Sequence, residues 1–190
     1  MNSRNILIAM GSPRKNGNST CLARKAAEGI ESVGGTYEIL HLHDLDIKPC
    51  TACEWCRENL GSFCVINDDM RSIYPKLQEA EGLIVASPVY WFSVSAQTKL
   101  FMDRWYGFMD SEGYLLKGKR IGIILTFGDT DVFTSGAVNA LRTFQDAFTY
   151  VEARLIGSVY GSADKPGEIQ SHNDLLEKAF QLGQKMVTSR

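Results

Sequence analysis

Residues 4–20 read RNILIAMGSPRKNGNST, and the class of fold follows from this stretch. Its first part, residues 4–10, has the apolar centre ILIA, which predicts a buried β-strand. A polar, glycine-containing loop comes next, followed by a helix from residue 18 to about 33, which Asn18 or Ser19 would cap and Gly34-Gly35 would end. A buried strand that leads through a short loop into a helix is the first unit of an α/β sheet.

Strand-like and helix-like stretches alternate along the rest of the chain. Further strands are predicted over 36–42, 82–87, 120–127 and 153–160, and further helices over 68–80, 95–108, 135–150 and 168–187. This alternation predicts a five-stranded parallel sheet, doubly wound, between two layers of helices. Such a three-layer α/β sandwich is the flavodoxin-like arrangement, in which ligands bind beyond the carboxyl ends of the strands.

The composition is that of an ordinary globular protein, with 190 residues, 44% of them hydrophobic and 22% charged. This length favours a single domain over 1–190, with a cysteine-rich insertion at about 43–67. The net charge of −2 gives no reason to expect nucleic acid or an anionic membrane as a partner. No apolar run reaches the roughly 18–20 residues of a membrane span, and the N-terminus lacks a signal-peptide pattern, so a cytoplasmic location is expected.

The loop after the first strand (residues 11–20, the phosphate loop) has the features of an anion site. The start of the following helix offers free backbone N–H groups and the positive end of the helix dipole. Hydroxyl, amide and guanidinium donors come from Ser12, Arg14, Asn18, Ser19 and Thr20. The loop lacks the Walker lysine pattern and the GxGxxG spacing, which disfavours ATP hydrolysis and a dinucleotide site. The alternative is a polar turn that only caps the helix.

Four cysteines lie within fifteen residues: Cys50, Cys53, Cys56 and Cys64. In a reducing compartment, clustered cysteines more often bind metal or carry out redox chemistry than form disulfides. Two successive CxxC steps let thiolates converge on one iron–sulfur cluster, whereas zinc sites usually pair two CxxC units across a longer spacer. The spacing therefore favours iron–sulfur. Zinc, with His41 and His43 close by in sequence, and free redox-active thiols are the alternatives.

The remaining nucleophilic and basic side chains suggest no catalytic site. Cys21 is predicted to be a small buried residue in the first helix. The histidines are scattered along the chain, and neither a GxSxG elbow nor a Ser/His/Asp set is present. We therefore assign no catalytic residue.

Two motifs make the chain resemble the NADPH-dependent FMN reductase family: GSPR…NS in residues 11–19 and SPVYW…SVSAQ…K…FMDR in residues 87–104. With the cysteines added, it is most similar to the iron–sulfur flavoprotein branch. The resemblance implies FMN as a cofactor and a 4Fe–4S cluster on the four cysteines. It also implies that the loops after the third and fourth strands hold the flavin ring through Pro88, Val89, Tyr90, Trp91, Thr126 and Gly128. The alternative for Tyr90 and Trp91 is a place in the core or at an interface.

These inferences predict a flavin- and iron–sulfur-dependent oxidoreductase that passes electrons between a one-electron donor such as ferredoxin and an acceptor. The first alternative is a cluster-free NAD(P)H-dependent FMN or quinone reductase. The second is a flavodoxin-like electron carrier with no substrate of its own.

A homo-oligomer, dimer or tetramer, is predicted from an apolar and aromatic stretch that contains Phe101, Met102, Trp105, Tyr106, Phe108, Met109, Tyr114, Leu115 and Leu116. One helix face can bury only some of these side chains in its own core. Aromatic and methionine residues left exposed are typical interface anchors. The family resemblance also implies an oligomer, and the alternative is that all of them pack internally.

Overall fold

The structure, a computed structural model, describes residues 4–189. Parallel strands form its main sheet in the order β2 (Thr36–His41), β1 (Asn5–Met10), β3 (Gly82–Tyr90), β7 (Arg120–Phe127) and β8 (Arg154–Ser162). The winding direction reverses between β1 and β3, which is where a doubly wound sheet places its ligand crevice. The prediction of a five-stranded parallel, doubly wound sheet is confirmed.

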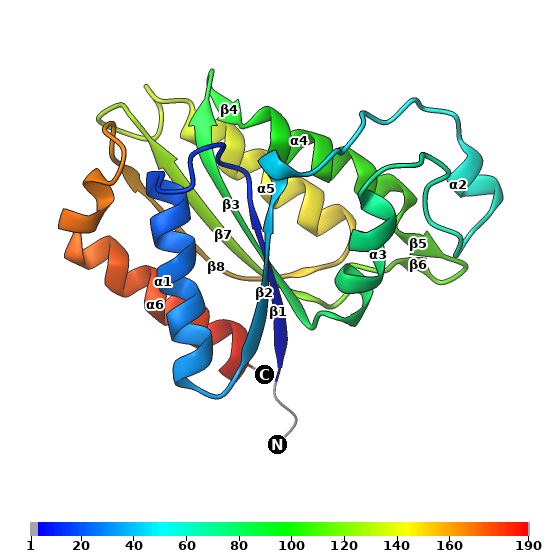
Figure 1. The fold of residues 1–190 in the computed structure, drawn as a ribbon, viewed down its shortest axis with the longest axis horizontal. Coiled ribbons are helices and arrows are strands. Elements are labelled where there is room, and N and C mark those ends of the chain that lie inside the picture. The colour runs from blue at the N-terminus through cyan, green and yellow to red at the C-terminus, as the bar shows by residue number, and fades with distance from the viewer. Residues whose placement is uncertain (1–3, 190) are drawn as a thin grey trace.

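Helices cover both faces of the sheet (Figure 1). One face carries α1 (Asn18–Ser32) and α6 (Asn173–Thr188), and the other carries α3 (Met70–Glu79), α4 (Ala96–Asp103) and α5 (Ala137–Tyr150). Alternate residues of β1 enter the two cores: Ile6 and Ile8 pack toward α1, whereas Leu7 and Ala9 pack toward α3 and α5. None of the helices within residues 4–189 has the length and hydrophobicity that a transmembrane span requires.

The start of α1 differs from the prediction, while its end agrees with it. The N-cap is Gly17 in an extended conformation, with no capping side chain, so the expected cap by Asn18 or Ser19 is wrong. At the other end, Gly34 has a φ of 80°, and the N–H groups of Gly34 and Gly35 each donate to a carbonyl of the last turn at 3.0 Å. This is the left-handed glycine termination that the Gly34-Gly35 pair predicts.

Several short elements were not predicted. Strand β3 continues to Tyr90 and turns back through Trp91 and Phe92 into β4 (Ser93–Val94). A 3₁₀ turn, η3 (Glu168–Ser171), precedes α6, so the last helix begins later than predicted. The region of the cysteines holds the 3₁₀ turn η1 (Leu42–Asp44) and one short helix, α2 (Trp55–Glu58).

The helix predicted over 95–108 ends at Asp103. A 3₁₀ turn, η2 (Arg104–Gly107), follows, and then a hairpin of β5 (Met109–Asp110) and β6 (Gly113–Tyr114). Because the chain folds back here, more than one face of the stretch meets the core. Six side chains are at most 9% exposed: Phe101, Met102, Trp105, Phe108, Met109 and Leu116. Most of the apolar surplus on which the oligomer prediction rested is thus buried within one chain.

Candidate functional site

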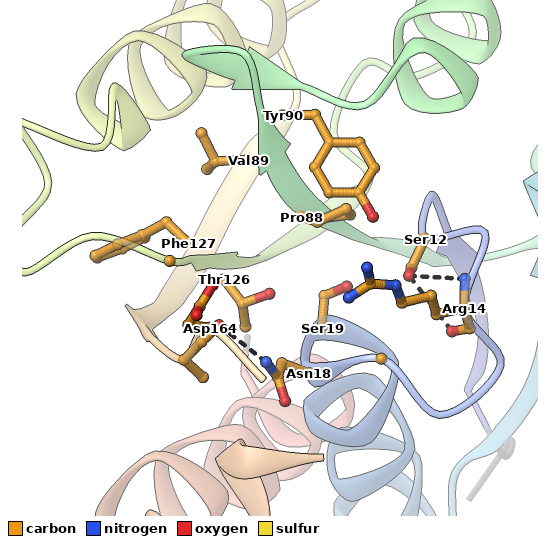
Figure 2. A pocket seen from close by; sticks show the side chains of 13 residues that line it. Ser12, Arg14, Asn18, Ser19, Pro88, Val89, Tyr90, Thr126, Phe127 and Asp164 are labelled. Carbon is orange, nitrogen blue, oxygen red and sulfur yellow. Dashed lines mark hydrogen bonds between the residues drawn. The ribbon is translucent and has the colours of Figure 1, made fainter. Parts of the chain in front are cut away.

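A cavity of about 330 Å³ opens at the carboxyl ends of β1, β3, β7 and β8 (Figure 2). Nine of the eleven residues predicted to bind the cofactor line it: Ser12, Arg14, Asn18, Ser19, Pro88, Val89, Tyr90, Thr126 and Gly128. The phosphate loop and the loops expected to hold the ring therefore meet in one cavity, although they come from different strands.

The phosphate loop is shaped by its own hydrogen bonds. The N–H of Arg14 donates to Ser12 Oγ at 3.1 Å, and the carbonyl of Arg14 accepts from the N–H of Gly17 at 3.0 Å and from Thr20 Oγ1 at 3.2 Å. Thr20 is 1% exposed and does not line the cavity, so it shapes the loop from behind. The first turn of α1 contains no acidic residue, so no side chain of this turn neutralises the positive end of the helix dipole.

Asn18 connects the phosphate loop to the segment after β8. Its amide nitrogen donates to the carbonyls of Ala163 at 2.9 Å and Lys165 at 3.0 Å, and its Oδ1 accepts from the N–H of Ile169 at 3.3 Å. These bonds occupy the side chain that the sequence suggested as a phosphate donor. They also hold Ala163 and Asp164 at the edge of the cavity (Figure 2).

The two aromatic residues predicted for the ring site have different surroundings. The ring of Tyr90 faces the cavity (Figure 2), and the residue is 42% exposed. Trp91 does not line this cavity. It is 93% exposed and borders an adjoining hollow of about 250 Å³, together with Phe92. Trp91 and Phe92 have positive φ angles, 48° and 66°, and this conformation costs roughly 1–2 kcal/mol for each non-glycine residue.

The sequence analysis missed two cavity residues, Ala163 and Asp164. Gly17 and Phe127 also line the cavity and belong to the loops that the sequence already assigned to the ligand. Ala163 directly follows β8, so the rule that ligands bind beyond strand ends, applied to every strand, would have found it.

The cavity offers both kinds of group that FMN needs. The guanidinium of Arg14, the hydroxyl of Ser19 and the start of α1 suit a phosphate. Tyr90 and Phe127 also line the cavity and suit a flat, apolar ring system. The residues present therefore fit the cofactor that the resemblance implies.

Most of the cysteine segment (residues 43–67), including α2, lies beyond α3 on the side away from α1 (Figure 1), whereas Asp44 near its start pairs with Lys15 of the phosphate loop at 3.4 Å. Cys50 and Cys53 are exposed, while Cys56 and Cys64 are partly buried. A methyl group placed on Gly107 would lie 3.4 Å from the Cβ atoms of both Cys56 and Cys64, so these two flank the same point of η2. Within residues 4–189, no three His, Cys, Asp or Glu side chains come together as a metal-binding group.

The electrostatics of the segment suit a cationic centre. Burial raises the pKa of the Cys56 thiol, and the nearby Cys64, Cys53 and Cys50 raise it further. A set of thiolates in this place therefore needs a positive charge, such as that of iron or zinc, to stay ionised. Three non-glycine residues beside the cysteines, Ala52, Glu54 and Phe63, have φ angles of 52°, 57° and 59°. Backbone strain of this kind persists only where surrounding contacts hold it.

The two ends of the cysteine segment are joined by hydrogen bonds. The N–H of Asp46 donates to Asp69 Oδ2 at 2.7 Å, and the N–H of Lys48 donates to Asp68 Oδ2 at 3.0 Å. The guanidinium of Arg104 pairs with Asp68 and donates to the carbonyl of Lys48 at 2.9 Å. The Arg104 and Asp68 side chains are 1% and 0% exposed. The long loop is therefore anchored at its base by a buried ion pair.

Of the other residues singled out in the sequence, Cys21 is partly exposed rather than buried, with its Sγ 3.7 Å from Gln170 Nε2. The ring of His43 lies 3.1 Å from Gln97 Nε2, an ordinary side-chain contact. Trp55 lines a hollow of about 310 Å³ together with Phe63 and Cys64.

Comparisons with known proteins identify relatives over nearly the whole chain. An iron-sulfur flavoprotein of Methanocaldococcus jannaschii is 32% identical over 190 residues, covering 96% of this chain and 95% of its own. A putative NAD(P)H-dependent FMN-containing oxidoreductase of Bacillus subtilis is 28% identical over 182 residues, covering 93% and 95%. The structure of an NAD(P)H:quinone oxidoreductase from Methanothermobacter marburgensis superposes with a TM-score of 0.77 at 18% identity, covering 96% and 98%, and shares the fold. The model of the NADPH-dependent FMN reductase family matches residues 4–166, and the chain belongs to this family of flavin-dependent oxidoreductases.

Proposed function

We propose that the protein is an electron-transfer oxidoreductase that binds FMN in the cavity at the strand ends and a 4Fe–4S cluster on Cys50, Cys53, Cys56 and Cys64. It would pass electrons between a one-electron donor such as ferredoxin and an acceptor. The observation that carries the flavin half is the cavity itself, which combines a helix start and Arg14 with the aromatic side chains of Tyr90 and Phe127. FMN, when bound, exchanges one or two electrons and so connects one-electron and two-electron partners.

In this proposal each part of the cavity has a separate task. Arg14, Ser12 and Ser19 bind the phosphate with the N–H groups at the start of α1. Pro88, Val89 and Tyr90 orient the ring and exclude water from one side of it. Asn18 and Thr20 act indirectly, because their hydrogen bonds shape the loop.

The cluster half rests on the donor set and on the anchored segment. Four thiols in one segment match the ligand number of a 4Fe–4S cluster. The relative from Methanocaldococcus jannaschii, named an iron-sulfur flavoprotein, supports this assignment. The cluster-free NAD(P)H-dependent reductase is the second candidate, favoured by the exposed positions of Cys50 and Cys53 and by the name of the Bacillus subtilis relative.

An anaerobic visible spectrum with iron, zinc and acid-labile sulfide analysis tests the proposal. Flavin bands together with broad iron–sulfur absorption and stoichiometric sulfide are expected. Flavin bands with rapid NADPH oxidation and no iron would favour the cluster-free reductase. Flavin with neither cluster nor turnover would leave the flavodoxin-like carrier.

Replacing Arg14 with alanine is expected to weaken FMN binding by roughly ten- to a hundredfold. A hydrogen bond to a charged group is worth about 1.5–3 kcal/mol, and the phosphate would lose such a bond. Lys15→Ala is the matched control, because Lys15 belongs to the same loop but does not line the cavity. Titration of the apoprotein with FMN, followed by quenching of flavin fluorescence, measures both affinities. Equal affinities for the two variants would remove Arg14 from the phosphate site.

The protein is further proposed to work as a homodimer or homotetramer. In one chain α2, which carries Cys56, lies apart from the start of α1 (Figure 1), so a second chain would offer a shorter route between the two centres. Trp91, Phe92 and Phe133 are 93%, 53% and 74% exposed, and aromatic side chains of this kind anchor interfaces. Light scattering at micromolar concentration is expected to give at least twice the chain mass. A monomer with fully bound flavin would refute the proposal.

A further inference from the structure

Three buried hydroxyl groups lie directly behind the residues that line the FMN cavity. Ser87, Ser95 and Thr98 are each 0% exposed, and they lie outside the cavity lining. Ser87 precedes Pro88 in β3, while Ser95 is the N-cap of α4. Buried hydroxyls cost free energy unless their hydrogen bonds are made, so the partners of these groups show what they hold together.

The Ser95 hydroxyl has four hydrogen-bonding contacts, the longest of which is with Ser87 Oγ at 3.5 Å. It donates to the carbonyl of Gly11 at 2.7 Å and accepts from the N–H of Thr98 at 3.3 Å. It also lies 2.9 Å from Thr98 Oγ1. A hydroxyl has one proton, and that of Ser95 is directed at Gly11, so Thr98 is the donor in the side-chain pair. The Gly11 carbonyl is thus held by a serine more than eighty residues away in sequence.

The backbone of Ser95 reaches the carboxyl end of β3. Its N–H donates to Ser87 Oγ at 3.0 Å, and the Ser87 hydroxyl donates to the carbonyl of Pro88 at 2.8 Å. Gly11 begins the phosphate loop, and Pro88 begins the part of the cavity proposed for the ring. Ser95 therefore connects the phosphate loop to the end of β3, the two segments to which the proposed function assigns the phosphate and the ring of FMN.

The packing at this connection leaves no spare room. A methyl group placed on Gly11 would lie 1.8 Å from Thr98 Oγ1 and 2.9 Å from Ser95 Oγ. The N–H of Gly11 also donates to the carbonyl of Ala86 at 2.7 Å. The phosphate loop is thus fixed against β3 and α4 from two directions, and a small change at Ser95 would shift it relative to Pro88.

We propose that Ser95 is a positioning residue for the flavin, which sets the separation between the phosphate loop and the end of β3. This inference rests on the proposed FMN site. A ligand that is bound at both ends is sensitive to the distance between the two binding loops. Ser95 would therefore influence both the affinity for FMN and the difference in affinity between oxidised and reduced FMN, which appears as a reduction potential.

Ser95→Ala tests the proposal, with Ser93→Ala as a matched control. Ser93 is a partly exposed serine two residues earlier, in β4. FMN binding to Ser95→Ala is expected to weaken about tenfold, because the Gly11 carbonyl loses its buried donor. The midpoint potential of the bound flavin is expected to shift by about 30 mV for each tenfold difference between the losses for oxidised and reduced FMN. Ser93→Ala should match the wild type in both measurements.

Thr98→Val keeps the shape of the side chain and removes one partner of the Ser95 hydroxyl. It should therefore shift the FMN affinity and the flavin midpoint potential in the same direction as Ser95→Ala does. This variant decides the outcome if Ser95→Ala does not fold.

A lower melting temperature of the apoprotein with unchanged FMN affinity and midpoint potential would overturn the proposal, since Ser95 would then be merely structural. A wild-type protein that binds no FMN would instead refute the proposed function.

Discussion

Replacing Cys50, Cys53 or Cys56 with serine is expected to abolish assembly of the iron–sulfur cluster while leaving FMN bound. A serine hydroxyl does not supply the soft, ionised sulfur that iron–sulfur clusters require. The flavin should be unaffected, because no cysteine lines the cavity at the strand ends and α2, which carries Cys56, lies apart from the start of α1 (Figure 1). Anaerobic reconstitution followed by iron, sulfide and flavin analysis measures both cofactors in one sample.

Cys21→Ser is the matched control for these variants. Cys21 lies in α1, outside the segment, and a cysteine replacement there should leave the iron content at the wild-type value. The test also extends to Cys64, which seven residues separate from Cys56. Its Cβ flanks Gly107 together with that of Cys56, so we expect Cys64→Ser to lose the cluster as well. If the reconstituted wild-type protein holds no iron, the cluster-free reductase replaces this proposal.

The fold was largely predictable because local patterns specify it. The apolar run in residues 4–10 marks a strand buried on both faces, and Gly34-Gly35 ends α1 as predicted. Once five strands alternate with helices, the handedness of the crossovers leaves few topologies. The cavity follows from the same reasoning, since its lining comes from residues at or just beyond the ends of four parallel strands.

The errors concern contacts between distant parts of the chain. Asn18 looks like a helix cap and phosphate donor in its local sequence, yet its side chain binds carbonyls about 145 residues away. Trp91 follows Tyr90 at a strand end, but the tight turn into β4 directs it away from the cavity that Tyr90 lines. Neither the partner of Asn18 nor the length of the β3–β4 turn is visible in a window of ten residues.

Arg104 is the clearest example of a residue whose task only the structure reveals. In the sequence it ends a family motif, and in the structure it joins the two ends of the cysteine segment through Lys48 and Asp68. Its Nε is buried with no hydrogen-bond partner among the described residues, so the hydrogen bonds of the guanidinium do not fully offset the cost of burying it. Removing one member of a buried pair usually costs about 3–5 kcal/mol, because the other charge is left buried alone.

Arg104→Met is therefore expected to lower the free energy of unfolding by about 3–5 kcal/mol. The control is Arg142→Met, which removes an exposed Arg–Asp pair with Asp146 and should cost at most about 1 kcal/mol. Urea unfolding at neutral pH measures both. An Asp68→Asn/Arg104→Met double variant no longer has the buried carboxylate that lacks a partner. Its free energy of unfolding should therefore fall by less than the sum of the decreases in the two single variants.

The pH dependence gives a second measurement of the same ion pair. Burial by itself raises the pKa of Asp68, but the hydrogen bond and charge of Arg104, together with backbone N–H donors, lower it below its ordinary value of 3.8. A carboxylate with a lowered folded-state pKa contributes stability that is fully present above pH 3.8 and is lost as the pH falls through the folded-state value. The stability gap between the wild type and Arg104→Met should therefore be constant near neutral pH and shrink in acid. A gap that stays equally wide below pH 3.8, or Arg104→Met unfolding at the same urea concentration as Arg142→Met, would show that the Asp68 carboxylate is not what Arg104 stabilises.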